Sequence, residues 1–367
     1  MPLMRLGPGG VLTPGTPNNP RMSAFTPNRA NENPPKRIAR IQELLKTAAP
    51  KIAVVRGEGI GDVLMTTPAV HELKELFGGR CEITYATNTR YADAALVKVL
   101  KNNPDISEVI DRDNVDEANY DTVINLHCPA IGYEKFGNPP INRIDLFAHH
   151  MGFTSLKDPT PRLFLTKLEL EEGSSFMYRA GLWGKRVMLV QIHGTSPSRS
   201  IASATVRNAL IKLYQQYKIH SLIMTHNTDV ASDITWSDIP GSIVARDRDC
   251  REIAAIMCYC DLVLCPDSAI LHIAGALSIP TVSLFGPTDP RARVNYYPAA
   301  VAIWEGEKLG GHPHWYEKCP YGDLCWKLIT EDAIVESCAN HMAATKKIDV
   351  DKVAERSPGT IIQTDFI

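Results

Sequence analysis

Short β-rich runs alternate with helical stretches twice along this chain, and that alternation limits the possible folds more than any other feature. The first series, between residues 51 and 126, contains the runs IAVV, EITYAT, SEVID and DTVINL, separated by patterns such as PAVHELKELF and ADAALVKVLK. The second begins at Val187 with VMLVQI and continues through HSLIMT, SIVAR, DLVLC and TVSLF. Such alternation is typical of parallel sheets with crossover helices. We predict an α/β protein with two Rossmann-like domains facing one interdomain cleft.

The chain has 367 residues, a length that suits two domains. Residues 1–36 are rich in Pro and Asn without apolar periodicity, which predicts a disordered tail that is dispensable for folding. A helical pattern begins at Arg37, and a Pro-, Gly- and charge-rich stretch at about 152–185 is typical of an interdomain connection. Thr330 precedes two acids and predicts a helix start. The predicted division is an N-terminal Rossmann-like domain (37–165), a C-terminal Rossmann-like domain (180–345) and an extension (346–367).

Composition excludes several function classes. Hydrophobic residues at 44% and charged residues at 22% are ordinary for a globular protein, and a net charge of −2 provides no global basic field for nucleic acid. The nine cysteines are scattered, several of them in apolar runs, which favours a reducing cytosol. No apolar stretch is long enough to span a membrane. We expect a cytoplasmic protein, with peripheral contact at the inner face of the membrane left open.

The loop that follows the run IAVV is the first candidate site. Its glycines, Gly59 and Gly61 among them, let backbone approach a ligand at the carboxyl end of a strand, and Arg56 and Asp62 lie in the same loop. The spacing is not that of a dinucleotide-binding loop. We expect the helix to start near Thr66-Thr67-Pro68. Asp62 is then either a helix N-cap or a catalytic carboxylate projecting into the cleft.

Three further loops follow strands of the second series. Asp267 and Ser268 precede an apolar helix that contains His272, and free amides at such a helix start suit a phosphate, although Asp267 could equally be a cap and His272 a half-buried helix residue. The other two loops contain Gly286, Pro287 and Thr288, and Thr195, Ser196 and Arg199. Each reads alone as a turn. Because all four loops follow strand ends, we expect them to converge on one cleft.

Two segments together resemble a known family. GEGIGDVLMTTPAVHELKELF and DLVLCPDSAILHIAGALSIPTVSLFGPTDP are similar to the hallmark segments of the glycosyltransferase family 9 heptosyltransferases, and YDTVINLHCPAIGYEKF with NRIDLFAHHMG resembles the end of that family's first domain. The similarity extends over roughly residues 51–340. It implies a GT-B fold and an inverting transferase of lipopolysaccharide biosynthesis type. The implied donor is a nucleotide-diphosphate sugar, typically an ADP-heptose, with no cofactor.

The resemblance also implies roles for single residues. Asp62 matches the proposed general base, Asp267 and His272 match donor-binding positions, and Thr195 and Ser196 match a phosphate-contacting pair. Arg199 lies one residue away from the family's lysine, and the usual Trp-Pro is replaced by Ile-Ala-Ser. A carboxylate base and amides that stabilise a departing diphosphate suit sugar transfer. The resemblance makes 37–165 the acceptor domain and 180–345 the nucleotide-sugar donor domain. The acceptor itself is open among a glycan, a lipid-linked sugar, a protein, a nucleic-acid base and a small molecule.

Two alternatives and one metal hypothesis remain at this stage. A nucleotide-sugar epimerase or hydrolase uses similar two-domain folds, and a non-catalytic sugar-nucleotide-binding or structural protein would keep the same loops. Cys319, Cys325 and Cys338 lie near His312 and His314, but their spacing lacks the close CxxC pairs of structural zinc sites. We therefore expect no metal site.

Overall fold

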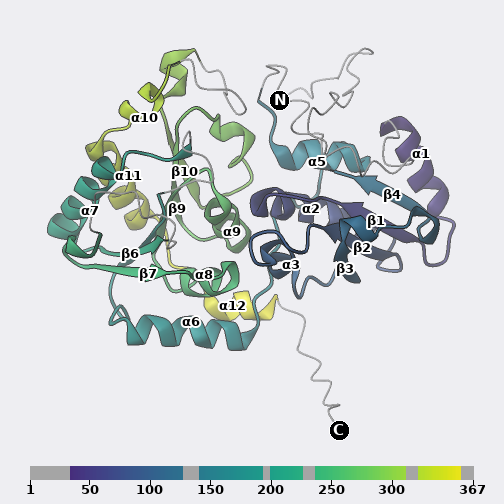
Figure 1. Ribbon diagram of the computed structural model, residues 1–367, viewed down its shortest axis with the longest axis horizontal. Coiled ribbons are helices and arrows are strands. Elements are labelled where there is room, and N and C mark those ends of the chain that lie inside the picture. The colour runs from purple at the N-terminus through teal and green to yellow at the C-terminus, as the bar shows by residue number, and fades with distance from the viewer. Residues whose placement is uncertain (1–33, 127–139, 193–198, 226–235, 311–320, 357–367) are drawn as a thin grey trace, which may run out of the picture.

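The protein consists of two α/β units that lie side by side (Figure 1). The computed structural model describes residues 34–126, 140–192, 199–225, 236–310 and 321–356. Both units are built on parallel sheets, of four and six strands, so the predicted fold class is confirmed.

The first sheet has the strand order β3-β2-β1-β4, with β1 inside the sheet. Four of the five residues of β1 are buried, as expected for a strand covered on both faces. The elements of this unit are α1 (Pro34–Leu44), β1 (Lys51–Val55), α2 (Ile60–Leu76), β2 (Glu82–Thr87), α3 (Ala95–Leu100), β3 (Glu108–Asp111), η1 (Arg112–Asn114), η2 (Glu117–Asn119), β4 (Thr122–Asn125) and α5 (Arg143–Met151).

The second sheet has the order β10-β9-β8-β5-β6-β7, and its central strands are fully buried. Its elements are β5 (Val187–Val190), α7 (Ser203–Tyr217), β6 (His220–Thr225), η4 (Trp236–Asp238), β7 (Ser242–Arg246), α8 (Cys250–Met257), β8 (Leu262–Pro266), α9 (Ala269–Leu277), β9 (Thr281–Phe285), η5 (Pro290–Ala292), β10 (Ala300–Trp304), η6 (Gly306–Leu309), α10 (Leu324–Lys327) and α11 (Glu331–Ala344). The predicted start of α11 is confirmed, since Thr330 accepts a hydrogen bond from the backbone amide of Ala333.

Helix α2 starts earlier than its sequence predicts. It begins at Ile60, whereas the Thr-Thr-Pro sequence predicted a start near Thr66. Gly59, with φ 80°, lets the chain turn from β1 directly into the helix. Pro68, inside the helix, cannot donate to the carbonyl of Leu64, and the Thr67 hydroxyl donates to that oxygen instead at 2.7 Å. The helix therefore continues through its proline.

One helix starts earlier than predicted, and two others lie in the segments predicted as the interdomain connection and the C-terminal extension. Helix α1 begins at Pro34, three residues before the predicted start at Arg37, because proline fits the first turn of a helix. Residues 1–33, the rest of the predicted tail, lie outside the described residues. Helix α6 (Lys167–Arg179) lies in the predicted interdomain connection, and a capping box of Thr166 and Glu169 starts it. Helix α12 (Val350–Glu355) belongs to the predicted extension and packs on α6 (Figure 1).

The two units share one apolar core. The same buried cluster contains Val54 and Leu64 of the first unit and Ile253 and Ile273 of the second. It is continuous where α2 packs on α9 and α3 packs on α8. In Figure 1, α5 lies at the upper end of the contact between the units, and α6, α8 and α12 lie at the lower end. The units therefore meet through a packed apolar interface, with α5 at one end of it and α6, α8 and α12 at the other.

Candidate functional site

The predicted site loops follow strands that are neighbours in the sheets. Strands β5, β8 and β9 pair side by side, so the segments after Val190, Pro266 and Phe285 leave the same sheet edge. Strand β1, which precedes Arg56, lies inside the first sheet. The carboxyl ends of parallel strands are the usual place for ligand sites in open α/β sheets.

Asp62 lies at the contact between the two units and is held by two arginines. Arg56 donates to its Oδ2 at 2.5 Å, and Arg143, in the first turn of α5, donates to its Oδ1 at 2.6 Å. All three side chains are largely buried, with the Asp62 side chain 14% exposed. Burial alone would raise the pKa of this carboxyl, but Arg143, Arg56 and Arg293 together hold it well below its ordinary value. Asp62 is therefore a carboxylate at every physiological pH.

The cap reading of Asp62 is wrong. Gly59 occupies the N-cap position of α2, and Asp62 is the third helical residue, with its side chain turned to the arginines. An acid in the first turn is favoured by the helix dipole. Of the two roles left open for Asp62, the structure excludes the N-cap, and the catalytic role stays a prediction.

Asp267 is the centre of a second buried charge cluster. Its carboxylate lies 3.6 Å from Nε of Arg293, 3.8 Å from Nε2 of His272 and 4.0 Å from Nη1 of Arg199. Oδ2 of Asp267 is buried with no hydrogen-bond partner among the described residues. Burial would raise the pKa of Asp267, but Arg293, His272 and Arg199 lower it well below the ordinary range. A buried carboxylate oxygen without a donor can accept hydrogen bonds from a ligand.

His272 joins the two charge clusters across the interface. A Cβ atom on Gly61 would lie 2.2 Å from Cδ2 of the His272 ring, so the ring lies directly on the first turn of α2. On the same face of α9, the ring of Tyr297 lies on Gly275, where a Cβ would approach within 2.7 Å. The Tyr297 hydroxyl lies 2.6 Å from Nδ1 of His272. Two glycines thus allow the close approach that brings Asp62 and Asp267 to one place.

The protonation state of His272 follows from its surroundings. Burial lowers the pKa of this imidazole, and Asp267 offsets that effect only in part, so the ring is neutral at neutral pH. Burial also raises the pKa of the Tyr297 phenol, which therefore stays protonated and can donate to Nδ1. A hydrogen on Nε2 would point to the Asp267 carboxylate, and Nδ1 would then accept from the Tyr297 hydroxyl.

The remaining predicted residues differ in their surroundings. Ser268, not Asp267, is the N-cap of α9, and its hydroxyl donates to Oε1 of Gln191 at 2.7 Å instead of capping the helix. His272 is buried, not half-buried.

Gly286 lies under the indole of Trp326, so close packing accounts for this glycine. Pro287 and Thr288 are buried beside it, and the Thr288 hydroxyl has no hydrogen-bond partner among the described residues.

Two further predictions extend beyond the described residues. Thr195 and Ser196 lie outside them, as do Cys319, His312 and His314 of the metal hypothesis. Cys325 and Cys338 are both buried. Within the described ranges, no group of three or more His, Cys, Asp or Glu residues could hold a metal ion.

Sequence reasoning missed three groups of this site: Arg143, Arg293 and Tyr297. Arg143 stands in the segment NRIDLFAHHMG and Arg293 follows the Asp289-Pro290 turn, so both lie close to segments already singled out. Neither occupies the end of a strand, which was the feature used to select candidates. No local sequence pattern identifies their partners, because Arg143 reaches Asp62 and Arg293 reaches Asp267 only in the folded structure.

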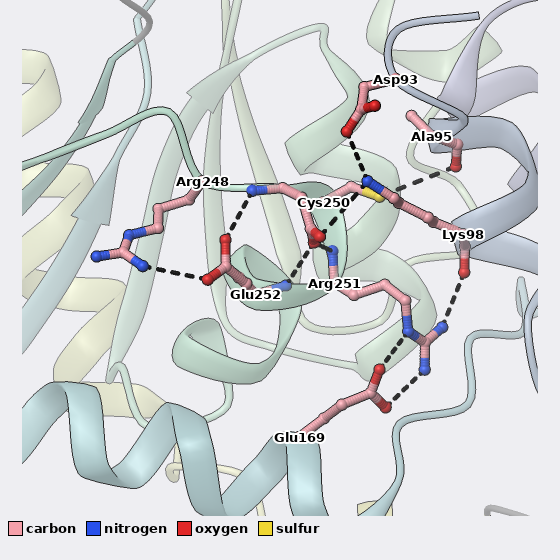
Figure 2. Close-up of polar contacts among 9 residues, drawn as sticks. Asp93, Ala95, Lys98, Glu169, Arg248, Cys250, Arg251 and Glu252 are labelled. Atoms are coloured by element: carbon pink, nitrogen blue, oxygen red, sulfur yellow. Dashed lines mark hydrogen bonds and ion pairs between the residues drawn. The ribbon is translucent and has the colours of Figure 1, made fainter. Parts of the chain in front are cut away.

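A separate cavity of about 560 Å³ lies between α3, α6 and α8 and is lined by none of the predicted site residues. Its charged groups pair mostly with each other (Figure 2). Arg251, 6% exposed, holds Glu169 with Nε at 2.5 Å and Nη2 at 2.8 Å, and also donates to the carbonyls of Lys98 and Phe164. Arg248 pairs with Glu252. We conclude that these charged groups hold α6 and the two units together.

Comparisons with known proteins show which family and which folds the chain resembles. The family model described as glycosyltransferase family 9 (heptosyltransferase) matches residues 209–323, a range that includes Asp267, His272 and Arg293. No curated protein matches the chain by sequence. The predicted resemblance is thus confirmed within the second unit.

Solved structures resemble the chain over both units. A glycosyl transferase family 9 protein from Veillonella parvula is 18% identical, with 81% of this chain and 98% of that chain covered and a TM-score of 0.63. The Escherichia coli ADP-heptose lipopolysaccharide heptosyltransferase II is 13% identical, with 80% and 99% covered and a TM-score of 0.60. TibC of enterotoxigenic E. coli, a dodecameric iron-containing heptosyltransferase solved with ADP-D-β-D-heptose, is 14% identical, with 81% and 77% covered and a TM-score of 0.58. At these identities the likeness establishes the fold, GT-B.

No helix within the described parts of the chain combines the length and the apolar character needed to cross a bilayer.

Proposed function

We propose a function from the premise that this chain is a glycosyltransferase with a family 9 domain on a GT-B fold. In this proposal the protein transfers a heptose or related sugar from a nucleoside-diphosphate sugar to an acceptor hydroxyl, with inversion at the anomeric carbon. The observation that carries the proposal is the contact of His272 with Gly61. This contact brings a carboxylate of the first unit next to a cluster of the second unit that has a buried, unsatisfied acceptor oxygen on Asp267 and two arginines, Arg293 and Arg199.

The second unit supplies the donor site in this proposal. Arg293 and Arg199 beside Asp267 provide positive charge for a diphosphate, and the free amides at the start of α9 face the same region. Asp267, an anion, would accept hydrogen bonds from sugar hydroxyls. Thr195 and Ser196, by family resemblance, would contact the phosphates. Gly286, Pro287 and Thr288 would border the nucleotide sugar, with the Thr288 hydroxyl offering a hydrogen bond.

The first unit supplies the base. Each carboxylate oxygen has two acceptor directions, so Asp62 can hold Arg56 and Arg143 and still accept a proton from the acceptor hydroxyl. The oxygen of the acceptor hydroxyl attacks the anomeric carbon while the bond from that carbon to the diphosphate breaks, and the nucleoside diphosphate leaves with the electron pair. The low pKa of Asp62 makes it a weak base in the ground state. The hydroxyl becomes acidic as the new bond forms, and the arginines keep the carboxylate ionised and oriented.

The proposal also covers the donor, the acceptor, the place of action and the cofactor requirement. The donor we propose is an ADP-heptose or a related nucleotide sugar, the nucleotide sugar named with TibC. The acceptor is a glycan, with a lipid-linked glycan the first to test because heptosyltransferase II acts in lipopolysaccharide synthesis. The protein works at the cytoplasmic side, where nucleotide sugars are made, with peripheral contact at the membrane. The chemistry requires no cofactor.

The test measures release of nucleoside diphosphate from nucleotide sugars with and without acceptor. Release that depends on acceptor supports transfer, release without acceptor indicates a hydrolase, and binding without release indicates a non-catalytic protein. Asp62→Asn should lower kcat by about 10²–10⁴-fold, the range of general-base catalysis, and leave ADP affinity by calorimetry nearly unchanged. His272→Ala should weaken ADP binding. The opposite pattern would assign the two units the reverse roles.

A further inference from the structure

The first turn of α5 contacts the second unit as well as Asp62. The Tyr296 hydroxyl donates to Oδ1 of Asp145 at 2.7 Å, and Nδ2 of Asn142 lies 3.5 Å from the carbonyl of Arg291. Arg143, which lies between Asn142 and Asp145 in the sequence, donates to the Asp62 carboxylate. One helical turn of the first unit therefore joins the proposed base to the segment that follows η5 in the second unit.

Tyr296 and Tyr297 are consecutive and reach opposite sides of the interface. Tyr296 is half-buried and bonds Asp145, whereas Tyr297 is 3% exposed and lies 2.6 Å from Nδ1 of His272. The Tyr297 ring fits against Gly275, which fixes its distance from His272. The two side chains thus hold one short backbone segment between the first unit, through Asp145, and His272.

We propose that Asp145 and Tyr296 form an interdomain clasp, and that Tyr296 is a positioning residue that holds the proposed base against the donor cluster. This proposal rests on the proposed function. The clasp joins the units at the α5 end of their interface, and the Arg251 cluster joins them at the α8 end (Figures 1 and 2). A rotation of one unit about the α8 end would separate the clasp residues while leaving the Arg251 contacts in place.

The chemistry of the pair suits a contact that can open. Asp145 and Tyr296 are both only partly buried, so each can be hydrated when the units separate. A hydrogen bond from a phenol to a carboxylate is nonetheless stronger than a neutral one. The clasp therefore favours the closed arrangement without making it irreversible, which a transferase that must admit substrate and release product requires.

The test compares Tyr296→Phe with two matched variants. Tyr296→Phe removes only the clasp hydroxyl, and acceptor-dependent kcat/KM should fall about tenfold or more, the effect of losing a hydrogen bond to a charged group, while ADP affinity stays within about twofold. Asp145→Asn keeps an oxygen acceptor without the charge and should retain more activity than Tyr296→Phe, whereas Asp145→Leu should behave like Tyr296→Phe. Tyr217→Phe is the control and should not change activity, because Tyr217 is exposed on α7.

A second measurement is independent of turnover. Small-angle scattering with saturating ADP should give a larger radius of gyration for Tyr296→Phe than for wild type. Unchanged kcat/KM with an unchanged radius would overturn the clasp, and so would loss of ADP binding in Tyr296→Phe, which would make Tyr296 a donor-site residue. If the wild-type protein releases no nucleotide from any sugar tested, the proposed function fails, and the scattering comparison alone decides the clasp.

Discussion

At the scale of single residues, the site depends on the lack of a side chain at Gly61. The His272 ring occupies the space of its missing side chain, so the contact between the proposed base and the donor cluster requires glycine there. This requirement is steric, because no positive φ is recorded at Gly61. The same is true of Gly275 under Tyr297.

Gly61→Ala is therefore expected to reduce activity more than stability. The added methyl group would lie 2.2 Å from the ring, so His272 or α2 must shift, and overpacking of this kind costs about 1–3 kcal/mol. We expect a loss of kcat of at least tenfold, since misplaced groups lose near-attack geometry. Activity and thermal unfolding are measured together. Gly181→Ala is the control: its φ of 65° makes alanine strained, but nothing lies within 4 Å, so it should lower Tm and spare activity. Equal activity losses in both variants would contradict the steric account.

The sequence located part of this site because of one general rule. Asp62, Asp267 and His272 follow strands, and strand ends of parallel sheets gather at one edge, so their convergence could be predicted without coordinates. Arg143 and Tyr297 could not be found this way. Their positions depend on how α5 and the segment after η5 dock, and that docking is set by packing between distant parts of the chain.

At the scale of elements, strands were predicted more accurately than helix boundaries. Each predicted β run contains a strand, because buried parallel strands are continuous apolar runs. Helix starts depend on contacts that a local pattern does not contain: α2 passes through Pro68 with the help of Thr67, and α6 begins at a capping box within a Pro- and charge-rich stretch. Glu169 of that box is also the partner of Arg251, so the start of α6 and the junction of the units share one carboxylate.

This shared carboxylate predicts a pH-dependent contribution to stability. Burial raises the pKa of Glu169, but Arg251 and Thr166 outweigh it and lower the value to about 2, from an ordinary 4.5. Because the folded-state pKa is the lower one, the contribution is complete above about pH 4.5 and is lost as pH falls toward 2. Glu169→Gln should lower the free energy of unfolding by roughly 2 kcal/mol at pH 7, the scale of hydrogen bonds to charged groups. Its deficit relative to wild type should shrink below pH 4.

Urea unfolding at a series of pH values measures this difference. Glu252→Gln is the matched control, because Glu252 also closes a capping box but pairs with the exposed Arg248, and exposed pairs contribute little. A Glu169→Gln deficit that is constant from pH 7 to pH 3 would mean that the carboxylate charge contributes nothing and that only the shape of the side chain matters.

At the scale of the whole molecule, the first unit is supported by the segment that precedes β1. Arg37 is 1% exposed and its guanidinium donates to the carbonyl of His150 in α5, while Ile41 and Leu44 belong to the shared core. Helix α1 thus packs against the helix that contains Arg143 and Asp145. A prediction from composition, that the tail is dispensable, applies only to residues before this helix.

Two truncations test where the dispensable segment ends. Removal of residues 1–33 should leave Tm within about 2 °C of the full chain, since their composition offers no apolar face to bury. Removal of residues 1–44 also deletes Ile41, Leu44 and the Arg37 contact. Losing two buried aliphatic side chains costs several kcal/mol, which corresponds to a fall in Tm of roughly 5–10 °C. The longer truncation should also lose activity, because α5 then lacks the support that places Arg143 against Asp62.

Arg37→Met in the full chain separates the two contributions of α1. It keeps the length and apolar stem of the side chain but removes the donor to His150, so it should lower Tm by less than the longer truncation does. A fall in Tm for the 1–33 truncation as large as that for the 1–44 truncation would show that residues 1–33 pack on the folded units. In that case the boundary of the first domain lies before α1, and the composition of the tail misled the prediction.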